Sequence, residues 1–482
     1  MSGRYAIGET KVRPGIYFHE SSANEVEIPG ATNGVVAVAF KANWGPLGEI
    51  ISLSSYNEIA KYFGDDSGSG SNVNILSRIF RGGASIIKAV RVGSGGTKAA
   101  ITLKDTTSGT AVDAVTLTAK FPGTRALSVT IKDSLSVATL RECIIYSGTT
   151  KLTEVSFEKG NAGEVDALVA AINGNADSVV VATKVADGNG LLAAVTNTTF
   201  TTAGVSPTIT NSDYSAAFTL LEASAWNVLC VDSDDTTIHA LVAAFIKRAT
   251  DSGLMGLAVV GEPTSVAFAT RKSHAAAFND PTMIYVANGF GDDNENSEGW
   301  KAAAYAAGYI AYLPCNDSVT HKVISGATKV VGALTNTEII EALQSGCLVF
   351  TVSASGNIWI EQGINTLVVL NSEQDKGWKK IRRAKTRYEL IDRTNIATEG
   401  IVGNVNNDEN GQDTFIAAAK GVVNAMIAEH KLVEGTVTLN PAYTPEGDSA
   451  WFVFDVVDLD SMEHIYINYL FHFRQTTGTA EA

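Results

Sequence analysis

Residues 225–262 read AWNVLCVDSDDTTIHALVAAFIKRATDSGLMGLAVVGE. Two short apolar runs enclose a stretch at 236–253 that has the length and composition of a helix and stops at Gly253. The same alternation of apolar run and helix-like stretch repeats up to residue 314. Strands separated by helices of this length predict βαβ units and a mostly parallel sheet.

The chain has 482 residues, more than one hydrophobic core usually supports, so we expect about three domains. Between 95 and 205 it is rich in Thr, Val, Ser and Ala in short alternating runs, which predicts an inserted all-β domain with one candidate helix at 164–173. The predicted fold class is therefore multidomain, α/β and α+β. Its parts are an N-terminal arm (1–24), a central α/β domain (25–94 plus 206–365), the β-rich insert (95–205), a C-terminal α+β domain (366–462) and a C-terminal arm (463–482).

The charge and cysteine content exclude several classes of protein. The chain carries 36 basic and 51 acidic residues, so its surface as a whole does not favour nucleic acid or anionic lipid. The N-terminus lacks the apolar core of a secretory signal, and no apolar run approaches the length of about 18 residues that spans a membrane. We expect a soluble protein made in the cytoplasm.

Four widely separated cysteines are expected to be buried thiols: Cys143, Cys230, Cys315 and Cys347.

The α/β region shows none of the usual catalytic patterns. The phosphate-loop pattern GxxxxGK[ST], the dinucleotide pattern GxGxxG, the GxSxG nucleophile elbow and the HExxH zinc motif are all absent. The seven histidines are scattered along the chain. We therefore predict a protein that is not an enzyme and needs no cofactor or metal.

The segment DSMEHIYINYLFHFRQ, residues 460–475, lies almost at the end of the chain. Its apolar residues fall on every second position, which predicts a half-buried β-strand. A long apolar strand near a free end invites pairing with another chain, so this strand needs a partner. An internal place in its own domain is the alternative that stays open. The alternating residues are Ile465, Ile467, Tyr469, Phe471 and Phe473.

A basic segment at 376–393 contains eight basic residues and only two acidic ones. If it forms one helix, an apolar stripe packs on its own domain and a basic stripe faces outward. In an acidic protein this ridge favours an acidic partner over nucleic acid, although an ordinary solvated face is equally compatible. The basic stripe is Lys376, Lys379, Lys380, Arg383 and Arg387, and the apolar stripe is Trp378, Ile381, Tyr388 and Ile391.

Several segments together resemble the tail sheath proteins of contractile phage tails and phage-tail-like bacteriocins. The N-terminal half contributes KVRPGIYFHE, GVVAVAFKANWGPLGEI and AKFPGTRALSVTI. The C-terminal half contributes IWIEQGINTL, WKKIRRAKTRYELIDRTNI and WFVFDVVDLDSMEHIYINYLFHF. The insert departs most from the family pattern.

This resemblance implies that the terminal strands are donated to the C-terminal-domain sheets of neighbouring subunits, which is β-augmentation. It also implies hexameric rings stacked helically around an inner tube, with baseplate and tail terminator proteins as further partners. The sheath would contract from a metastable extended state, in a virion tail or a phage-tail-like particle assembled in the bacterial cytoplasm. It implies no nucleic-acid partner and no membrane insertion. The basic segment resembles the tube-attachment helix. The donated N-terminal residues would be Val12, Ile16, Tyr17 and Phe18.

Two other functions remain open from the sequence. One is a structural polymer that does not contract, which would show a single axial repeat. The other is an α/β enzyme with an unrecognised site, which turnover or tight nucleotide binding would reveal.

Overall fold

The computed structural model describes residues 2–4, 16–18, 33–64, 70–160 and 163–472. Its centre is a seven-stranded sheet in the order β19-β15-β14-β13-β3-β5-β4. Neighbouring strands are parallel except for the antiparallel pair β4–β5, so the sheet predicted from the alternating pattern is confirmed. The strands are β3 (Val35–Phe40), β4 (Ile50–Leu53), β5 (Ile86–Arg91), β13 (Val228–Val231), β14 (Leu257–Gly261), β15 (Met283–Val286) and β19 (Cys347–Leu348).

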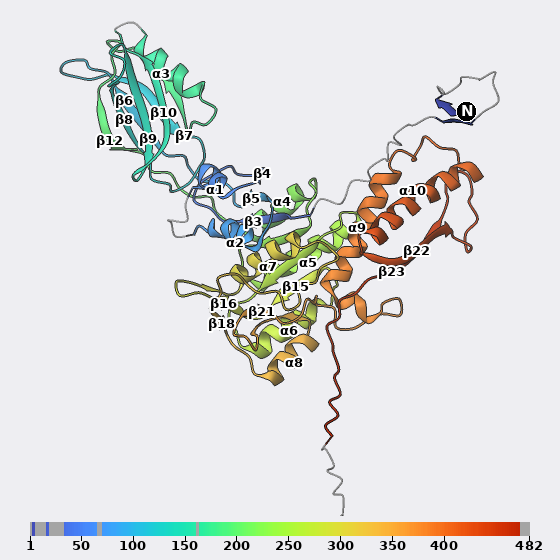
Figure 1. Ribbon diagram of the computed structural model, residues 1–482. Helices are drawn as coiled ribbons and strands as arrows, with labels where there is room; N and C mark the ends of the chain where they lie inside the picture. Colours follow the sequence, from blue (N-terminus) through green and yellow to red (C-terminus); the bar gives the residue numbers. More distant parts are fainter. Residues whose placement is uncertain (1, 5–15, 19–32, 65–69, 161–162, 473–482) are drawn as a thin grey trace, which may run out of the picture.

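Helices cover both faces of this sheet (Figure 1), which is why its inner strands β3, β13, β14 and β15 are apolar and buried. Alternate residues of β3 enter different cores: Val36, Val38 and Phe40 belong to one, and Val35, Ala37 and Ala39 to the other. The first core includes α1 (Tyr56–Phe63), α2 (Asn74–Gly82) and α7 (Trp300–Tyr312). The second includes α4 (Asn211–Leu221), α5 (Thr236–Asp251), α6 (Phe268–Phe278) and α8 (Asn336–Gln344).

Helices α2 and α7 approach so closely that only glycine fits at two facing positions. A Cβ added at Gly308 would lie 2.1 Å from the carbonyl oxygen of Ile79, and one at Gly82 would lie 2.4 Å from that of Tyr305. Both obstacles are backbone atoms, so no rotamer change relieves them.

We predict that Gly308→Ala lowers the free energy of unfolding by about 1–3 kcal/mol, because the helices must separate to admit the methyl group. Helix propensity alone would favour alanine by about 1 kcal/mol, so the two effects have opposite signs. Chemical denaturation of Gly308→Ala and of Gly400→Ala provides the comparison, because a Cβ at Gly400 meets open space. Equal stability of the two variants would contradict the close contact.

Five short strands complete this part of the chain. They form one three-stranded antiparallel sheet, β17-β16-β18, and one antiparallel pair, β20–β21. Their bounds are β16 (Gly289–Gly291), β17 (Asn296–Ser297), β18 (Lys329–Val331), β20 (Phe350–Val352) and β21 (Ile358–Ile360).

The part of the chain that follows β5 and precedes α4 has a hydrophobic core of its own. It contains two antiparallel sheets, β10-β9-β8-β12 and β11-β7-β6, with α3 (Glu164–Asn173) packed against them. The candidate helix is confirmed, so the region is β-rich and not all-β. Its strands are β6 (Ala100–Lys104), β7 (Asp113–Ala119), β8 (Ser128–Asp133), β9 (Leu140–Ser147), β10 (Thr150–Glu158), β11 (Val180–Lys184) and β12 (Val195–Thr199).

The chain enters and leaves this region through one narrow stem. Ser94 pairs with Thr208, Thr97 with Val205 and Ala100 with Thr202, all antiparallel. The entering and leaving chains therefore lie side by side.

The base of the region is fixed by one arginine and one tryptophan from the central part of the chain. Arg91 is buried and donates to the carbonyl oxygens of Ala42 (2.9 Å), Gly45 (2.8 Å) and Pro122 (2.9 Å). Burial lowers the pKa of Arg91 to about 10. Trp44 is 1% exposed and packs edge to face on Phe121, at 5.5 Å between ring centroids. The WGP turn and the FPG segment noted in the sequence therefore meet in one joint.

The C-terminal part comprises a short 3₁₀ turn η1 (Lys376–Lys379), helices α9 (Ile381–Thr398) and α10 (Glu409–Ala428), and strands β22 (Leu432–Leu439) and β23 (Phe452–Asp458). The two strands pair antiparallel and the two helices pack together on them. At the other end of the chain, β1 (Ser2–Arg4) pairs in parallel with β2 (Ile16–Phe18). Among the described residues, no helix is both long and apolar enough to cross a bilayer.

Candidate intersubunit site

The antiparallel pair β22–β23 is the first part of the candidate site. Leu432, Val437, Phe454 and Val456 face α9 and α10, and they form a small core with residues such as Met426. The opposite face of the pair carries the exposed side chains of Val433, Val453 and Val457. Within the described residues the sheet has only these two strands, so each has one outer edge with no strand beside it. A two-stranded sheet with free edges is a natural acceptor for further strands.

The second part of the site is the C-terminal segment. From His464 to His472 the chain runs away from the body of the molecule as an extended trace with no strand partner among the described residues (Figure 1). The predicted strand residues Ile465, Ile467, Tyr469 and Phe471 are all exposed, with Phe471 at 87%. An exposed apolar segment of this kind marks a site of interaction with another surface. Phe473 lies outside the described residues.

The N-terminal candidates are described only in part. Ile16, Tyr17 and Phe18 form β2, in register with Ser2, Gly3 and Arg4 of the same chain. Val12 lies outside the described residues. A strand at 16–18 agrees with the sequence pattern, and its donation to another subunit stays a prediction.

The prediction of a single helix over 376–393 with a basic ridge facing outward is wrong. Lys380 has extended backbone and separates η1 from α9. The cause is a long-range backbone contact: Asn365 N–H donates to Lys379 O at 2.9 Å, and Ile381 N–H donates to Gly363 O at 3.0 Å. Because the chain is diverted here, Lys376, Lys379 and Lys380 do not share a helix face with Arg383 and Arg387.

Most of the basic side chains of this segment bind groups of the same chain. Lys379 donates to Val368 O at 2.8 Å, and Lys380 contacts Asp460 at 2.7 Å. Arg383 binds Asp458 through two nitrogens, at 2.5 and 2.6 Å, and this hydrogen bonding raises the pKa of Arg383. Arg387 lies over the ring of Trp378, 4.1 Å from its centroid, and burial lowers the pKa of Arg387.

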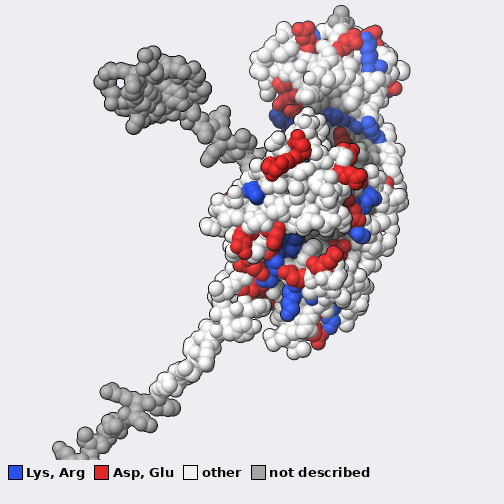
Figure 2. All heavy atoms as spheres, turned by 90° about the vertical axis from the view of Figure 1, so that its right-hand side faces the viewer, with Lys and Arg blue, Asp and Glu red and all other residues white. Residues whose placement is uncertain are grey.

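Figure 2 shows the same outcome at the surface. On the face that it displays, Lys and Arg atoms are interspersed with Asp and Glu atoms. Of the five residues of the predicted basic stripe, Lys376 is exposed and the other four are half-buried. The predicted apolar stripe is split as well, since Ile381 is buried and Ile391 is exposed.

A buried ionic cluster joins α9 to the end of α10. Arg393 contacts Glu389 at 2.7 Å and Glu429 at 2.7 Å, and Lys431 contacts both carboxylates at 2.5 Å. The hydrogen bond from Arg393, helped by Lys431, lowers the pKa of Glu429 to about 2. The cluster holds β22 against the helices, because Lys431 directly precedes that strand.

Lys385 and Asp392, also on α9, lie against the central part of the chain. Lys385 donates to the carbonyl oxygens of Ile310 and Leu313, and burial lowers its pKa to about 8. Burial raises the pKa of Asp392 to about 6. Both line a small cavity with Asn227, and in the described part of the chain no group of three or more His, Cys, Asp or Glu is arranged to hold a metal ion.

Sequence reasoning missed two parts of this site. Strand β22 follows α10 after only three residues, and its alternation of Thr436, Val437, Thr438 and Leu439 was the available signal. The acidic residues of 458–463 were also missed as partners of the basic segment. Their signal was an acidic run immediately before an apolar strand.

Comparison with known proteins places the chain beside tail sheath proteins. Residues 208–366 match the model of the phage tail sheath protein central domain. The chain contains a phage tail sheath domain. The matched residues of this sheath domain run from just before α4 to just after β21.

Two Bacillus subtilis proteins are similar to this chain along most of its length. YqbK is 26% identical over 388 residues, which is 78% of each chain. XkdK of the phage-like element PBSX is 24% identical over 390 residues, again 78% of each chain.

Solved sheath structures share the fold. The sheath tail protein from Desulfitobacterium hafniense aligns over 92% of this chain and 100% of its own, with 20% identity and a TM-score of 0.66. The sheath of an extracellular contractile injection system, PVC, in its contracted state aligns over 96% of this chain and 98% of its own, with 9% identity and a TM-score of 0.55. Over most of its length the chain therefore has the fold of a tail sheath protein.

Proposed function

We propose that this chain is the structural subunit of a contractile tail sheath. Subunits polymerise as stacked hexameric rings around an inner tube, and they contract from a metastable extended state to drive the tube through a target cell envelope. One observation carries the proposal. An exposed, alternating apolar segment projects from a body that also presents a two-stranded sheet with two free edges.

Each chain carries both a strand that can be donated and a sheet edge that can accept one, which is the physical reason for the proposal. A strand added to a sheet edge satisfies main-chain N–H and C=O groups, and alternate side chains set its register. Donation of residues 463–474, and of residues 11–19, to β22–β23 of neighbouring subunits covers the apolar side chains and completes the sheet. Since the donor and acceptor surfaces lie on different copies, the pairing propagates into a polymer.

The remaining assignments follow from the same proposal. The partners are further copies of this chain, the inner tail tube, the baseplate and the tail terminator, in a virion tail or phage-tail-like particle assembled in the bacterial cytoplasm. The arms (1–24 and 463–482) are the links between subunits. The central domain is formed by 25–94 plus 206–365, the insert (95–205) lies outward, and the C-terminal domain (366–462) faces the tube.

The tube-facing surface is the 376–387 segment, with Lys376 as its exposed charge. Because Lys380 and Arg383 are already paired within the chain, the attraction to an acidic tube is modest. Exposed ion pairs are worth about 0.2–1 kcal/mol each, so many subunits together hold a tube that each one releases easily.

The test is removal of residues 464–482, which leaves the body of the molecule intact. We expect hollow cylinders from the full chain by electron microscopy and only monomers or short rings from the truncated chain. The free energy of unfolding should change by less than about 0.5 kcal/mol, because residues 464–472 bury almost nothing in the monomer. Cylinders from the truncated chain would refute the proposal.

A matched pair of point variants tests the register. Ile467→Lys places a charge on the alternating apolar face of the segment, and Asn468→Lys places the same charge on the other face. We expect the first to block assembly and the second to permit it. Two axial repeats in the cylinders, one before and one after triggering, identify contraction, whereas a single repeat identifies a sheath that does not contract.

A further inference from the structure

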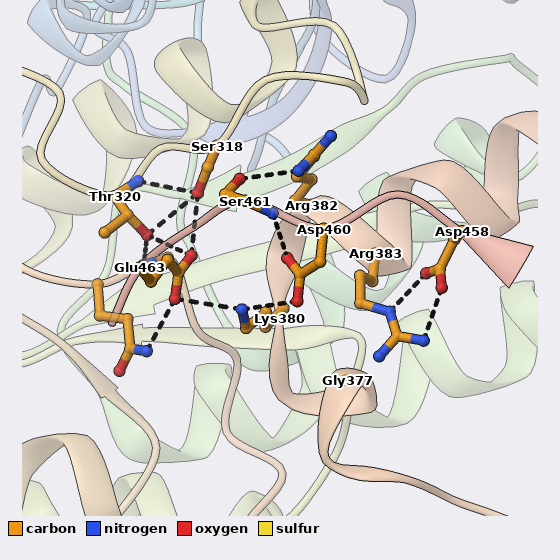
Figure 3. A network of polar contacts seen from close by, with 12 residues as sticks. Ser318, Thr320, Gly377, Lys380, Arg382, Arg383, Asp458, Asp460, Ser461 and Glu463 are labelled. Carbon is orange, nitrogen blue, oxygen red and sulfur yellow. Dashed lines mark hydrogen bonds and ion pairs between the residues drawn. The ribbon is translucent and has the colours of Figure 1, made fainter. Parts of the chain in front are cut away.

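The six residues DLDSME, 458–463, join β23 to the exposed C-terminal segment, and we call them the arm root. The arm root is held almost entirely by polar side chains (Figure 3). Its two apolar side chains, Leu459 and Met462, are exposed, so apolar packing does not fix its course. At its start, Asp458 is the last residue of β23 and pairs with Leu432, and Leu459 N–H donates to Lys431 O at 3.2 Å.

Three residues of the arm root bind the start of α9. Asp458 accepts two hydrogen bonds from Arg383, and Asp460 accepts one from Lys380 at 2.7 Å. Ser461 Oγ accepts one from Arg382 Nη1 at 2.8 Å. The hydrogen bonds from Lys380 and from the N–H of Ser461 outweigh burial and lower the pKa of Asp460, so it is charged at neutral pH.

Glu463 closes the arm root. Its side chain is only 6% exposed, and its carboxylate faces Lys380 Nζ at 3.3 Å. It also accepts hydrogen bonds from Thr320 Oγ1 at 3.0 Å, Gln362 Nε2 at 3.0 Å and Ser318 Oγ at 3.4 Å. A carboxylate this sheltered is stable only because several donors from different segments surround it.

The C-terminal segment changes from bound to exposed between Glu463 and His464. From His464 to His472 the side chains are exposed, and these residues have no strand partner within the described part of the chain. Glu463 is therefore the last fixed point of the C-terminal segment on its own subunit.

We propose that Asp458, Asp460 and Glu463, with Lys380, Arg382 and Arg383, form a polar clamp that fixes the point and direction at which the C-terminal arm leaves its subunit. This inference rests on the proposed function, in which the arm pairs with a neighbouring subunit. It also gives Lys380, Arg382 and Arg383 a role within their own subunit, while Lys376 of the same segment is exposed toward the proposed tube.

The clamp sets the reach of the arm. Residues 464–472 span roughly 30 Å when extended, and release of residues 459–463 would lengthen the free tether to roughly 46 Å. A longer tether that leaves in no fixed direction lowers the effective concentration of the strand at its acceptor edge. The clamp thus favours pairing at one distance, as a regular lattice requires.

The test measures arm position on the monomeric full chain. His464→Cys and Thr438→Cys provide two exposed sites for spin labels, and the four native cysteines are buried. Pulsed electron paramagnetic resonance should give one narrow distance peak. In the double variant Lys380→Met/Glu463→Gln we expect a broad distribution of distances in place of that peak. We also expect assembly to start at a protein concentration at least about two-fold higher than for the unmodified chain.

The matched control is Glu434→Gln, which removes an exposed carboxylate from β22 and should leave the narrow peak unchanged. Circular dichroism of each variant checks that the body remains folded. The charge swap Asp458→Arg/Arg383→Asp should keep the narrow peak, while Arg383→Asp alone should broaden it.

The outcomes separate the clamp from the proposed function. A narrow peak that survives in Lys380→Met/Glu463→Gln overturns the clamp, whatever the truncated chain does. Cylinders from the truncated chain overturn the proposed function, while the distance measurement on monomers still decides whether the clamp holds the arm.

Discussion

Replacement of Trp44 by alanine should lower the free energy of unfolding by about 3–5 kcal/mol, the usual range for truncating a buried tryptophan. Trp44 precedes β4 in the central part of the chain, yet its ring belongs to the core of the β-rich region, where it packs on Phe121. Its loss opens a cavity at the joint, next to the buried Arg91 and its carbonyl acceptors.

Hydrogen exchange locates this effect. In Trp44→Ala we expect faster exchange across residues 99–200 than across the central sheet, together with the loss of stability in urea. Trp451→Ala is the matched control, because that side chain is 39% exposed and its removal should cost less than about 1 kcal/mol. Equal losses in the two variants would contradict the role of Trp44 in the joint.

Glu389→Ala should also cost about 3–5 kcal/mol, the usual range when one partner of a buried ion pair is removed. The side chains of Glu389 and Arg393 are only 4% and 3% exposed, and Lys431 is 8% exposed. Without Glu389, two buried cations share the single carboxylate of Glu429. Alanine is the better helix former, so helix propensity would shift the result slightly in the opposite direction.

Denaturation of Glu389→Ala beside Glu399→Ala measures this loss. Glu399 lies at the exposed end of the same helix and no ion pair holds it in the structure, so its replacement should be nearly neutral. Hydrogen exchange should show weakened protection of β22, which follows Lys431 directly. A loss of less than about 1 kcal/mol would mean that desolvation of the cluster already cancels its attraction.

The elements that sequence reasoning predicted best depend on local pattern. The parallel sheet followed from the alternation at 225–262, and α5 begins and ends within the predicted stretch. The candidate helix at 164–173 also appears, because its apolar spacing packs on a sheet close by in sequence.

The elements that were missed depend on partners far away in the chain. The break at Lys380 comes from backbone contact with residues 363–365, and the charge of Arg383 is neutralised by Asp458, 75 residues away. A count of basic residues within 376–393 contains no information about acids beyond residue 450. Strand β22 was missed because helix α10 ends only three residues earlier.

The stem at Ser94–Thr208 has a consequence for engineering. Everything between Gly96 and Val205 is carried on two adjacent chains, with a core separate from that of the parallel sheet. An unrelated domain whose two termini lie close together can therefore replace this region at the stem, and the connectivity of the rest of the chain stays the same. Because Trp44 and Arg91 contact this region, the replacement unit must also cover these two side chains. Under the proposed function, the assembly would then display one such unit per subunit.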